Sequence, residues 1–519
     1  MHKREVDSAV MTAGFGLPIA GWAAGVYFAQ MPLTPFPAAF KETLHNGWHN
    51  PIVLGATIAT SAVAASLVYY LYEYCDDGFR GEQYQEFLRG SEIKNWHTVK
   101  AKVRRRNEKT NRERKKWGLA KSEPIMIGKL PMPLHLEDRN TMICASIGAG
   151  KSVTMEGMIA SALKRGDRLA VVDPNGTFYS KFSFKGDSIL NPFDERSVGW
   201  TIFNEIRGIH DFNRMAKSII PPQVDPSDEQ WCAYARDVLS DTMRKLKETN
   251  NPDQDTLVNL LVREDGDTIR AFLANTDSEG YFRDNAEKAI ASIQFMMNKY
   301  IRPLRYMSKG EFSIYKWVND PNAGNLFITW REDMRDTMKP LVATWIDTIC
   351  ATILSSEPMT GKRLWLFLDE LQSLGKLESF VPAATKGRKH GLRMVGSLQD
   401  WSQLNASYGR DDAETLLSCF RNYVILAAAN AKNAGMASEI LGSHDVKRWR
   451  KSYTAGKLTR TEEVTRDEPV VQASEISNLP DLVAYVKFGE DFPITKVKTP
   501  YIDYKERAQA IMLTGQAAA

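Results

Sequence analysis

The sequence predicts an α/β fold built on a mainly parallel sheet, with two membrane-spanning helices ahead of it. Three observations predict this class. Short apolar segments such as Thr141–Cys144 and Arg363–Leu368 alternate with helix-compatible stretches. A glycine-rich loop joins the first of these segments to a helix-compatible stretch. Two stretches of about twenty residues without a charge lie near the start of the chain, and that length suffices to cross a bilayer.

Composition narrows the class of protein further. The 519 residues carry 67 Lys and Arg against 63 Asp and Glu, and 43% of them are hydrophobic. These values exclude a collagen-like, low-complexity or fully disordered chain. The five Cys are scattered without a CxxC pair, which argues against a disulfide scaffold or a zinc site and suits a reducing cytoplasm. The length predicts two to four domains.

Two uncharged stretches, Ala9–Ala29 and Pro51–Tyr72, are the expected membrane spans. A cleaved signal peptide is the alternative for the first, but a second span follows at once and no clean cleavage site is evident. Buried core helices are the alternative for both, and the length of the stretches and their lack of a polar face weaken it. We therefore predict a transmembrane hairpin.

Flanking charge predicts the orientation of this hairpin. The loop Gln30–Asn50 carries only Lys41 and Glu42, whereas Lys94–Lys121 carries twelve Lys and Arg against two Glu. Positive residues favour the cytoplasmic side, so both termini are expected in the cytoplasm and the short loop outside. The basic stretch could also attract anionic lipid headgroups or contact nucleic-acid phosphates, and its position favours the membrane roles.

A phosphate-binding loop follows the first predicted strand. Ala145–Ser152 matches GxxxxGK[ST] except that Ala145 replaces the first glycine, and Val153–Lys164 is helix-compatible. We therefore expect Ala145 to avoid a positive φ angle. Lys151 would contact the β- and γ-phosphates of ATP, and the Ser152 hydroxyl would bind Mg²⁺. The expected nucleotide-binding residues are Gly148, Ala149, Gly150, Lys151, Ser152 and Val153.

An acidic pair more than 200 residues later is the expected partner of this loop. The apolar segment that begins at Arg363 ends at Asp369 and Glu370. Buried parallel strands are continuously apolar, and ligands bind at their carboxyl ends. Asp369 would therefore hold Mg²⁺ and Glu370 would polarise the attacking water. An ordinary Asp–Glu surface turn is the alternative.

A third strand, Arg393–Leu398, ends next to Gln399. This amide could sense the γ-phosphate or orient water, and Arg388, in the preceding Lys386–Lys389 segment, could stabilise phosphate charge within its subunit or across an interface. Taken alone, either side chain could equally be a solvated loop residue.

The remaining predictions concern organisation. Thr201–Met307 has helical spacing and is expected to form an all-α insertion, whereas Asn325–Trp330 and Asn422–Leu426 are expected strands. The mixed basic and aromatic segment Lys447–Tyr453 could stack on single-stranded DNA or form a solvated hairpin. Lys505–Ala519 is expected to be a frayed tail.

Together these features resemble the TrwB–TraD family of conjugative type IV secretion coupling proteins, and the compact TrwB-like branch most. The match covers nearly the whole chain, and DPNG with LNPFD after a phosphate loop is its most specific part. Besides the two spans, the matching motifs are ASIGAGKS (145–152), DPNG (173–176), LNPFD (190–194), LWLFLDE (364–370) and GSLQDWSQL (396–404).

The resemblance implies a hexameric, RecA-like ring of inner-membrane ATPases around a central channel, with ATP and Mg²⁺ as cofactors. It implies DNA-stimulated hydrolysis that pumps single-stranded DNA with its attached relaxase to the type IV secretion channel. Expected partners are single- and double-stranded DNA without strong sequence preference, the relaxase and relaxosome proteins, the channel components and the membrane.

Carried over by position, the resemblance makes Lys151, Glu370 and Gln399 catalytic and places Arg139 and Arg388 near the nucleotide. It also implies a division of the chain into four parts. These are the hairpin (1–79), a basic segment with the first part of the nucleotide-binding domain (80–200), the all-α insertion (201–307) and the second part of the nucleotide-binding domain (308–519).

Two alternatives stay open from sequence. A docking receptor would bind nucleotide and recruit the relaxosome while other ATPases drive export, and it would use the same residues. An FtsK-like DNA translocase would be expected to have more spans and a C-terminal winged helix, and neither is evident in the sequence.

Overall fold

The computed structural model describes residues 8–29, 31, 45–71, 86–223, 225–282, 287–358, 363–454, 457–489 and 492–515. They fall into two compact units. The first unit combines residues 1–102, 441–470 and 493–496. The second combines residues 103–440, 471–492 and 497–519.

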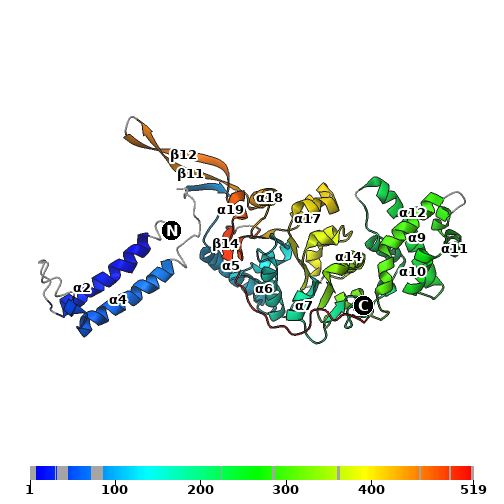
Figure 1. Ribbon diagram of the computed structural model, residues 1–519, viewed down its shortest axis with the longest axis horizontal. Helices are drawn as coiled ribbons and strands as arrows, with labels where there is room; N and C mark the ends of the chain where they lie inside the picture. The colour runs from blue at the N-terminus through cyan, green and yellow to red at the C-terminus, as the bar shows by residue number, and fades with distance from the viewer. Residues whose placement is uncertain are drawn as a thin grey trace. The chain divides into compact units, whose positions relative to one another are not determined.

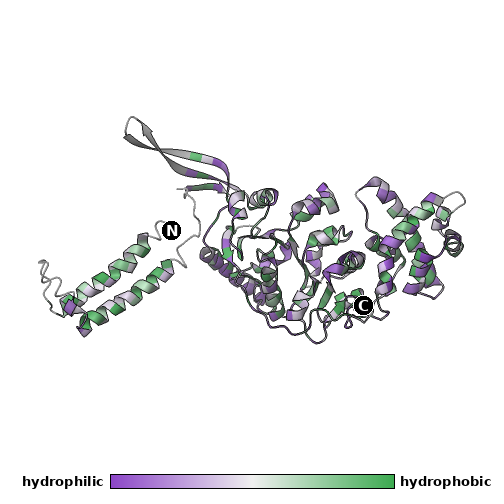
Figure 2. Ribbon diagram, viewed as in Figure 1, coloured by the Kyte–Doolittle hydropathy of each residue, from purple (hydrophilic) through white to green (hydrophobic). Residues whose placement is uncertain are grey.

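Two apolar helices open the first unit. A π-helical turn, η1 (Thr12–Gly16), leads into α2 (Leu17–Phe28), and α4 spans Pro51–Tyr70. The helical segments Ser8–Phe28, which includes η1 and α2, and Pro51–Tyr70 are each long and apolar enough to cross a membrane. Hydrophobic residues predominate along both of them (Figure 2). The predicted pair of apolar helices is confirmed, whereas their orientation stays a prediction. Tyr72, the last residue of the predicted second span, lies outside the described residues.

Small residues bring α2 and α4 together. Gly21 and Gly25 form a GxxxG pair on α2. A Cβ atom on Gly25 would lie 2.7 Å from Val53 Cα, and one on Gly21 would overlap Thr60. Glycines at this spacing let helix backbones approach closely, which is the main source of helix association in lipid. The hairpin is therefore packed along its own GxxxG face.

A three-stranded antiparallel sheet completes the first unit. Its strand order is β1 (Glu86–Gly90), β11 (Ser443–Thr454) and β12 (Lys457–Pro469). The basic and aromatic segment Lys447–Tyr453 lies on β11, and the side chains from Arg448 to Glu463 lie outside the described residues. The two alternatives for this segment, stacking on DNA and a solvated hairpin, therefore both stay open.

The basic stretch after the hairpin forms α5 (Trp96–Lys116). Its charged side chains leave only a narrow buried face, and polar bonds hold its later part, which belongs to the second unit. The Asn107 amide donates to the Met132 carbonyl (3.0 Å) and accepts from Leu134 N–H (2.8 Å). Asn111 likewise exchanges two hydrogen bonds with the backbone of Ser122.

The second unit is organised around a nine-stranded sheet in which seven neighbouring strands run parallel. These strands are buried along most of their length, as their continuous apolar runs predict. Since they are parallel, all their carboxyl ends meet at one edge. The order is β14 (Thr495–Lys498), β13 (Val483–Lys487), β10 (Asn422–Ile425), β4 (Thr141–Cys144), β9 (Leu392–Leu398), β8 (Leu364–Leu368), β5 (Arg168–Pro174), β7 (Leu326–Trp330) and β6 (Ser188–Leu190).

Helices connect these strands. The connections are α6 (Lys151–Lys164), α7 (Thr177–Phe182), α13 (Ile314–Asn319), α14 (Arg335–Ser355), α15 (Phe380–Lys386), α16 (Trp401–Tyr408), α17 (Arg410–Ser418), α18 (Ala431–Leu441) and α19 (Ala473–Ser477). Short elements near the strand ends are β2 (Met126–Ile127), β3 (Leu130–Pro131), η3 (Leu134–Arg139), η7 (Glu332–Met334), η8 (Leu371–Leu374) and η9 (Gly387–His390).

Between β6 and β7 the described chain is mostly helical. Its elements are η4 (Ile202–Glu205), α8 (Ile209–Ile219), α9 (Pro226–Glu248), α10 (Gln254–Arg263), α11 (Gly266–Phe272), η5 (Asp277–Phe282), α12 (Glu287–Tyr300) and η6 (Arg302–Tyr306). In Figure 1, α9 to α12 form a group of their own. Helix formation is as the spacing of apolar residues predicts, while the boundaries 201 and 307 of a separate domain stay a prediction.

The segment 499–515, here called the strap, corrects a prediction. Residues from Lys505 to Gly515 are not frayed: Met512 N–H donates to Asp194 Oδ2 (3.0 Å), and Thr514 N–H donates to the Phe193 carbonyl (3.0 Å). A Cβ atom on Gly176 would lie only 2.5 Å from the Ala510 carbonyl oxygen, so the strap packs closely on this glycine. Backbone bonds to distant residues order the strap, and such bonds leave no periodic pattern in the sequence.

A buried carboxylate joins the two ends of the helical region. Glu205 is 1% exposed and accepts hydrogen bonds from the indole N–H of Trp200 (2.9 Å), from Ile314 N–H (2.7 Å) and from Tyr315 N–H (3.0 Å). Two of these donors are the free N–H groups at the start of α13, so the carboxylate also caps that helix.

We predict that Glu205→Ala destabilises the second unit by about 3 kcal/mol, because three buried donors lose their acceptor. Glu205→Gln keeps one oxygen acceptor and should cost less. Differential scanning calorimetry of the full chain in detergent measures both effects as lowered unfolding temperatures. If the alanine variant unfolds at the same temperature as the wild type, the carboxylate contributes nothing to stability.

Candidate nucleotide-binding site

The predicted phosphate loop lies at the carboxyl edge of the sheet, between β4 and α6. Its backbone is fixed at the start by two hydrogen bonds: Ala145 N–H donates to the Leu398 carbonyl (3.1 Å), and Ser146 N–H donates to the Ala427 carbonyl (2.8 Å). Ala145 is not among the residues with a positive φ angle. The expectation for this departure from the glycine consensus is therefore met.

Two glycines give the loop its turn. Gly148 and Gly150 have φ angles of 80° and 108°, a region that residues other than glycine rarely adopt. A Cβ on Gly150 would lie 2.6 Å from Leu482 Cδ2, and Leu482 N–H donates to the Ala149 carbonyl (3.0 Å). A Cβ on Gly148 would have nothing within 4 Å. The loop therefore packs on Leu482 at Gly150 and is open at Gly148.

The loop lysine lies against the predicted magnesium ligand. Lys151 Nζ is 2.8 Å from Asp369 Oδ1, and both side chains are about 15% exposed. Ser397, on β9 between the two strands, donates from its hydroxyl to the same carboxylate oxygen (3.1 Å). Three neighbouring strands thus bring a cation, a carboxylate and a hydroxyl to one point.

Glu370 and Gln399 are also brought together. Glu370 has a left-handed backbone (φ 67°, ψ 60°), an uncommon conformation for a residue with a side chain, and such strain clusters at functional sites. Its N–H donates to Ser397 Oγ (2.9 Å), and its Oε1 accepts from Gln399 Nε2 (3.4 Å). A carboxylate and an amide in contact can orient a water molecule.

Sequence reasoning gave no role to Ser397, although this hydroxyl contacts both acidic residues. The available signal was a hydroxyl in an otherwise apolar strand, two residues before Gln399 and therefore on the same side of the strand.

Asp173 is a second residue to which sequence reasoning gave no role. It is the last residue but one of β5 and lies beside the end of β8. Asp173 is fully buried, and its Oδ2 accepts from Tyr179 N–H (2.7 Å) while its Oδ1 accepts no hydrogen bond among the described residues. Burial raises the pKa of Asp173 to about 7, and the charge of Asp369 adds to this effect.

The two predicted arginines lie elsewhere. Arg139 precedes β4 and Arg388 precedes β9, so both lie at the amino edge of the sheet, opposite the loop. Arg388 Nε donates to Asp138 Oδ2 (2.7 Å), and Arg139 Nε lies 4.0 Å from Asp138 Oδ1. The seven residues of β9 span about 20 Å. Neither arginine therefore meets the phosphate loop of its own subunit.

The residues present fit a magnesium nucleotide. The loop N–H groups lie at the start of α6, where a helix favours anions, and Val153 lies in the first turn of that helix. Ser152 and Asp369 offer oxygen donors, which Mg²⁺ prefers, and Mg²⁺ commonly keeps several waters besides one or two carboxylates. The described residues contain no cluster of three or more His, Cys, Asp or Glu side chains, so a site built wholly of such ligands is not present among them.

Comparisons with known proteins agree on one family. A family model described as the type IV secretion-system coupling protein DNA-binding domain matches residues 124–500. The solved unbound monoclinic form of the bacterial conjugative coupling protein TrwBdeltaN70 is 39% identical, with a TM-score of 0.78 over 84% of this chain and 98% of that chain. A structure of the plasmid coupling protein TrwB in complex with ADP and Mg²⁺ is 38% identical, with a TM-score of 0.76 over 84% of this chain and all of that one.

A further relative is the coupling protein TraD of Escherichia coli strain K12, which is 27% identical over 397 residues, or 73% of this chain. The chain spans 55% of the length of that TraD. The predicted fold class is confirmed: a RecA-like α/β domain, a helical region within it and two apolar helices ahead of it. The chain belongs to the TrwB–TraD family of conjugative type IV secretion coupling proteins.

Proposed function

We propose that this chain is a DNA-stimulated ATPase of a bacterial inner membrane, which pumps single-stranded DNA with its attached relaxase to a type IV secretion channel. The observation that carries the proposal is the meeting of Lys151, Asp369, Glu370 and Gln399 at one edge of the sheet. The DNA-binding description of the matching family and the TraD relative support DNA, the relaxosome and the channel proteins as partners.

Each residue has a role that follows from its chemistry. Lys151 and the loop N–H groups bind the phosphates of ATP. Ser152 and Asp369 would hold Mg²⁺, which neutralises phosphate charge when it is bound. Glu370, steadied by Gln399 and Ser397, positions the attacking water and receives its proton. Because Lys151 pairs with Asp369, the phosphates compete with this carboxylate for the lysine.

The arginines act across a subunit boundary in this proposal. Arg139 and Arg388 lie together at the amino edge, about 20 Å from the loop of the same subunit. A ring of six identical subunits would set the amino edge of one against the carboxyl edge of the next. Each arginine would then stabilise phosphate charge on its neighbour, as arginine fingers do.

Gly150→Ala should weaken nucleotide binding at least tenfold, because alanine is strained at φ 108° and collides with Leu482. Gly157→Ala is the matched control: it lies on α6, and its Cβ would have nothing within 4 Å. Isothermal titration calorimetry with ADP and Mg²⁺ measures the nucleotide affinity of both variants. Equal affinities for the two variants would contradict a nucleotide site at this loop.

Lys151→Ala should abolish both DNA-stimulated ATP hydrolysis and DNA transfer, because the phosphates lose their point charge. Lys185→Ala, an exposed lysine after α7, is the control and should transfer normally. Phosphate release and conjugation frequency are the measurements. Normal transfer by Lys151→Ala would favour a docking receptor over a motor.

Mixing Arg388→Ala with Lys151→Ala subunits should restore part of the hydrolysis that each variant alone has lost. Recovery is expected because an Arg388→Ala subunit keeps its loop and a Lys151→Ala neighbour supplies the arginine. The ATPase rate is followed across mixing ratios. A rate that stays at zero in every ratio would place the action of Arg388 within one subunit.

A further inference from the structure

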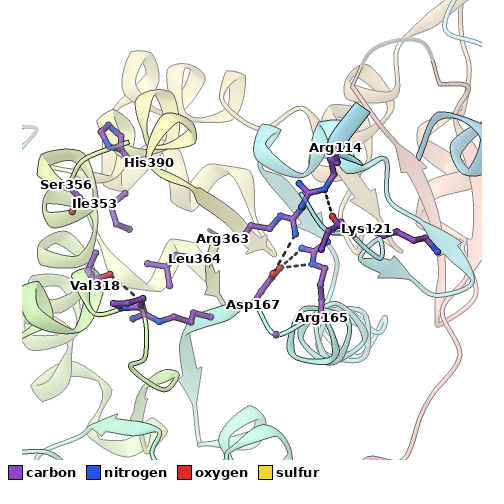
Figure 3. A pocket seen from close by; sticks show the side chains of 15 residues that line it. Arg114, Lys121, Arg165, Asp167, Val318, Ile353, Ser356, Arg363, Leu364 and His390 are labelled. Atoms are coloured by element: carbon purple, nitrogen blue, oxygen red, sulfur yellow. Dashed lines mark hydrogen bonds and ion pairs between the residues drawn. The ribbon is translucent and has the colours of Figure 1, made fainter. Parts of the chain in front are cut away.

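A polar cavity of about 330 Å³ lies within the second unit, at the amino edge of the sheet (Figure 3). It borders the first residues of β5 and β8, so the length of the strands separates it from the phosphate loop. Its size is at the lower end of the range for small-molecule sites, ~300–1,000 Å³. Nothing in the proposed ATPase reaction uses it.

One wall of this cavity is cationic. Figure 3 shows Asp167 between the side chains of Arg165 and Arg363. Arg165 is fully engaged: it donates to Glu137 Oε1 (2.7 Å), to Asp167 Oδ2 (2.9 Å) and to the Glu123 carbonyl (2.7 Å).

Arg363 differs from its neighbour. Its guanidinium lies 3.6 Å from Glu137 Oε2 and 3.8 Å from Asp167 Oδ1, and it donates no hydrogen bond among the described residues. Only 11% of its side chain is exposed. A guanidinium has five N–H donors in a fork that matches an oxyanion. Arg363 is therefore a largely buried fork that lines a cavity, with two carboxylates at ion-pair distance but no hydrogen-bond acceptor among the described residues.

Positive charge exceeds negative charge around this fork. The basic lining residues are Arg114, Lys121, Arg165, Arg168 and Arg363. Four carboxylates oppose them: Asp167 in the lining, Glu137 behind it, Glu123 at 3.1 Å from Lys121 Nζ, and Asp320 near Arg168. Burial lowers the pKa of Arg363, and the charges of Arg165 and Arg114 lower it further, although Glu137 and Asp167 oppose them. An anion in the cavity would relieve this repulsion.

The other wall is apolar. Val318, Ile353 and Leu364 lie on the side away from Arg114 and Lys121 (Figure 3). Two polar groups accompany them, Ser356 and His390, and the His390 Nδ1 atom is buried without a hydrogen bond among the described residues. A flat apolar group with polar edges suits this wall, whereas a bare phosphate would leave it unfilled.

We propose that this cavity is a second nucleotide site, which binds one nucleoside phosphate with its phosphate on Arg363, Arg114 and Lys121 and its base against Val318, Ile353 and Leu364. The same chemistry has two sources, a free mononucleotide or one nucleotide unit of single-stranded DNA. This inference goes beyond the proposed ATPase function, since it requires neither hydrolysis nor an intact phosphate loop.

The test uses full-length Lys151→Ala protein in detergent, so that binding at the phosphate loop is weakened. Equilibrium dialysis with radiolabelled thymidine monophosphate should reveal one site per chain. Adding Arg363→Gln should lower its affinity at least tenfold, because a charge-assisted, two-bond contact is lost. Fluorescence anisotropy with a labelled oligothymidylate, with and without the same change, shows whether a DNA strand also supplies the nucleotide.

Two further variants complete the test, one at the cavity and one control away from it. Lys121→Gln alters a side chain that is 74% exposed, so it should fold normally and still lower the affinity about threefold. Arg410→Gln removes an exposed charge far along the chain (83% exposed) and should change nothing. A tenfold loss for the monophosphate alone assigns the site to free nucleotide, and a loss for both ligands assigns it to DNA as well. The proposal is overturned if neither affinity falls in Arg363→Gln, or if sulfate competes as well as thymidine monophosphate.

Discussion

The contact between Lys151 and Asp369 depends on a constraint that shapes the whole second unit, the parallel course of its neighbouring strands. β4 carries the lysine loop, β8 carries the carboxylate, and β9 lies between them. Because all three end at one edge, Ser397 on the middle strand can bond to Asp369 and to the backbone of Glu370. Reversing any one of these strands would move its carboxyl end to the opposite edge of the sheet, and so separate its group from the other two by the length of a strand.

The two edges of this sheet differ in chemistry. The carboxyl edge has acidic side chains facing one lysine, with Asp173 buried beside Asp369, an arrangement suited to a bound cation and a phosphate chain. The amino edge gathers arginines around a few partly buried carboxylates, as at Asp138 and Asp167. In an assembly that stacks one edge on another, the surplus positive charge of one subunit would therefore meet the phosphates on the next.

Sequence alone predicted the elements whose signal is local. The strand at Thr141–Cys144 and the apolar run into Asp369 were predictable because buried parallel strands are uniformly apolar. Gly148 and Gly150 were predictable from the loop pattern. Ser397 could not be assigned, because its role exists only once β9 lies between β4 and β8. Leu482 was equally hidden, since its contact with Gly150 joins residues over 300 positions apart.

The strap has a consequence for how the protein is made. Met512 bonds to Asp194, and the two residues are 318 positions apart. At a ribosomal rate of ~5–20 residues per second, roughly 15–60 s separate their synthesis. During that interval Asp194 and Gly176 lack the chain that covers them, so the region around the ends of β5 and β6 can close only after the strap has been made. In a nascent chain the DPNG and LNPFD motifs that mark its family are thus open to chaperones and proteases until the strap has been made.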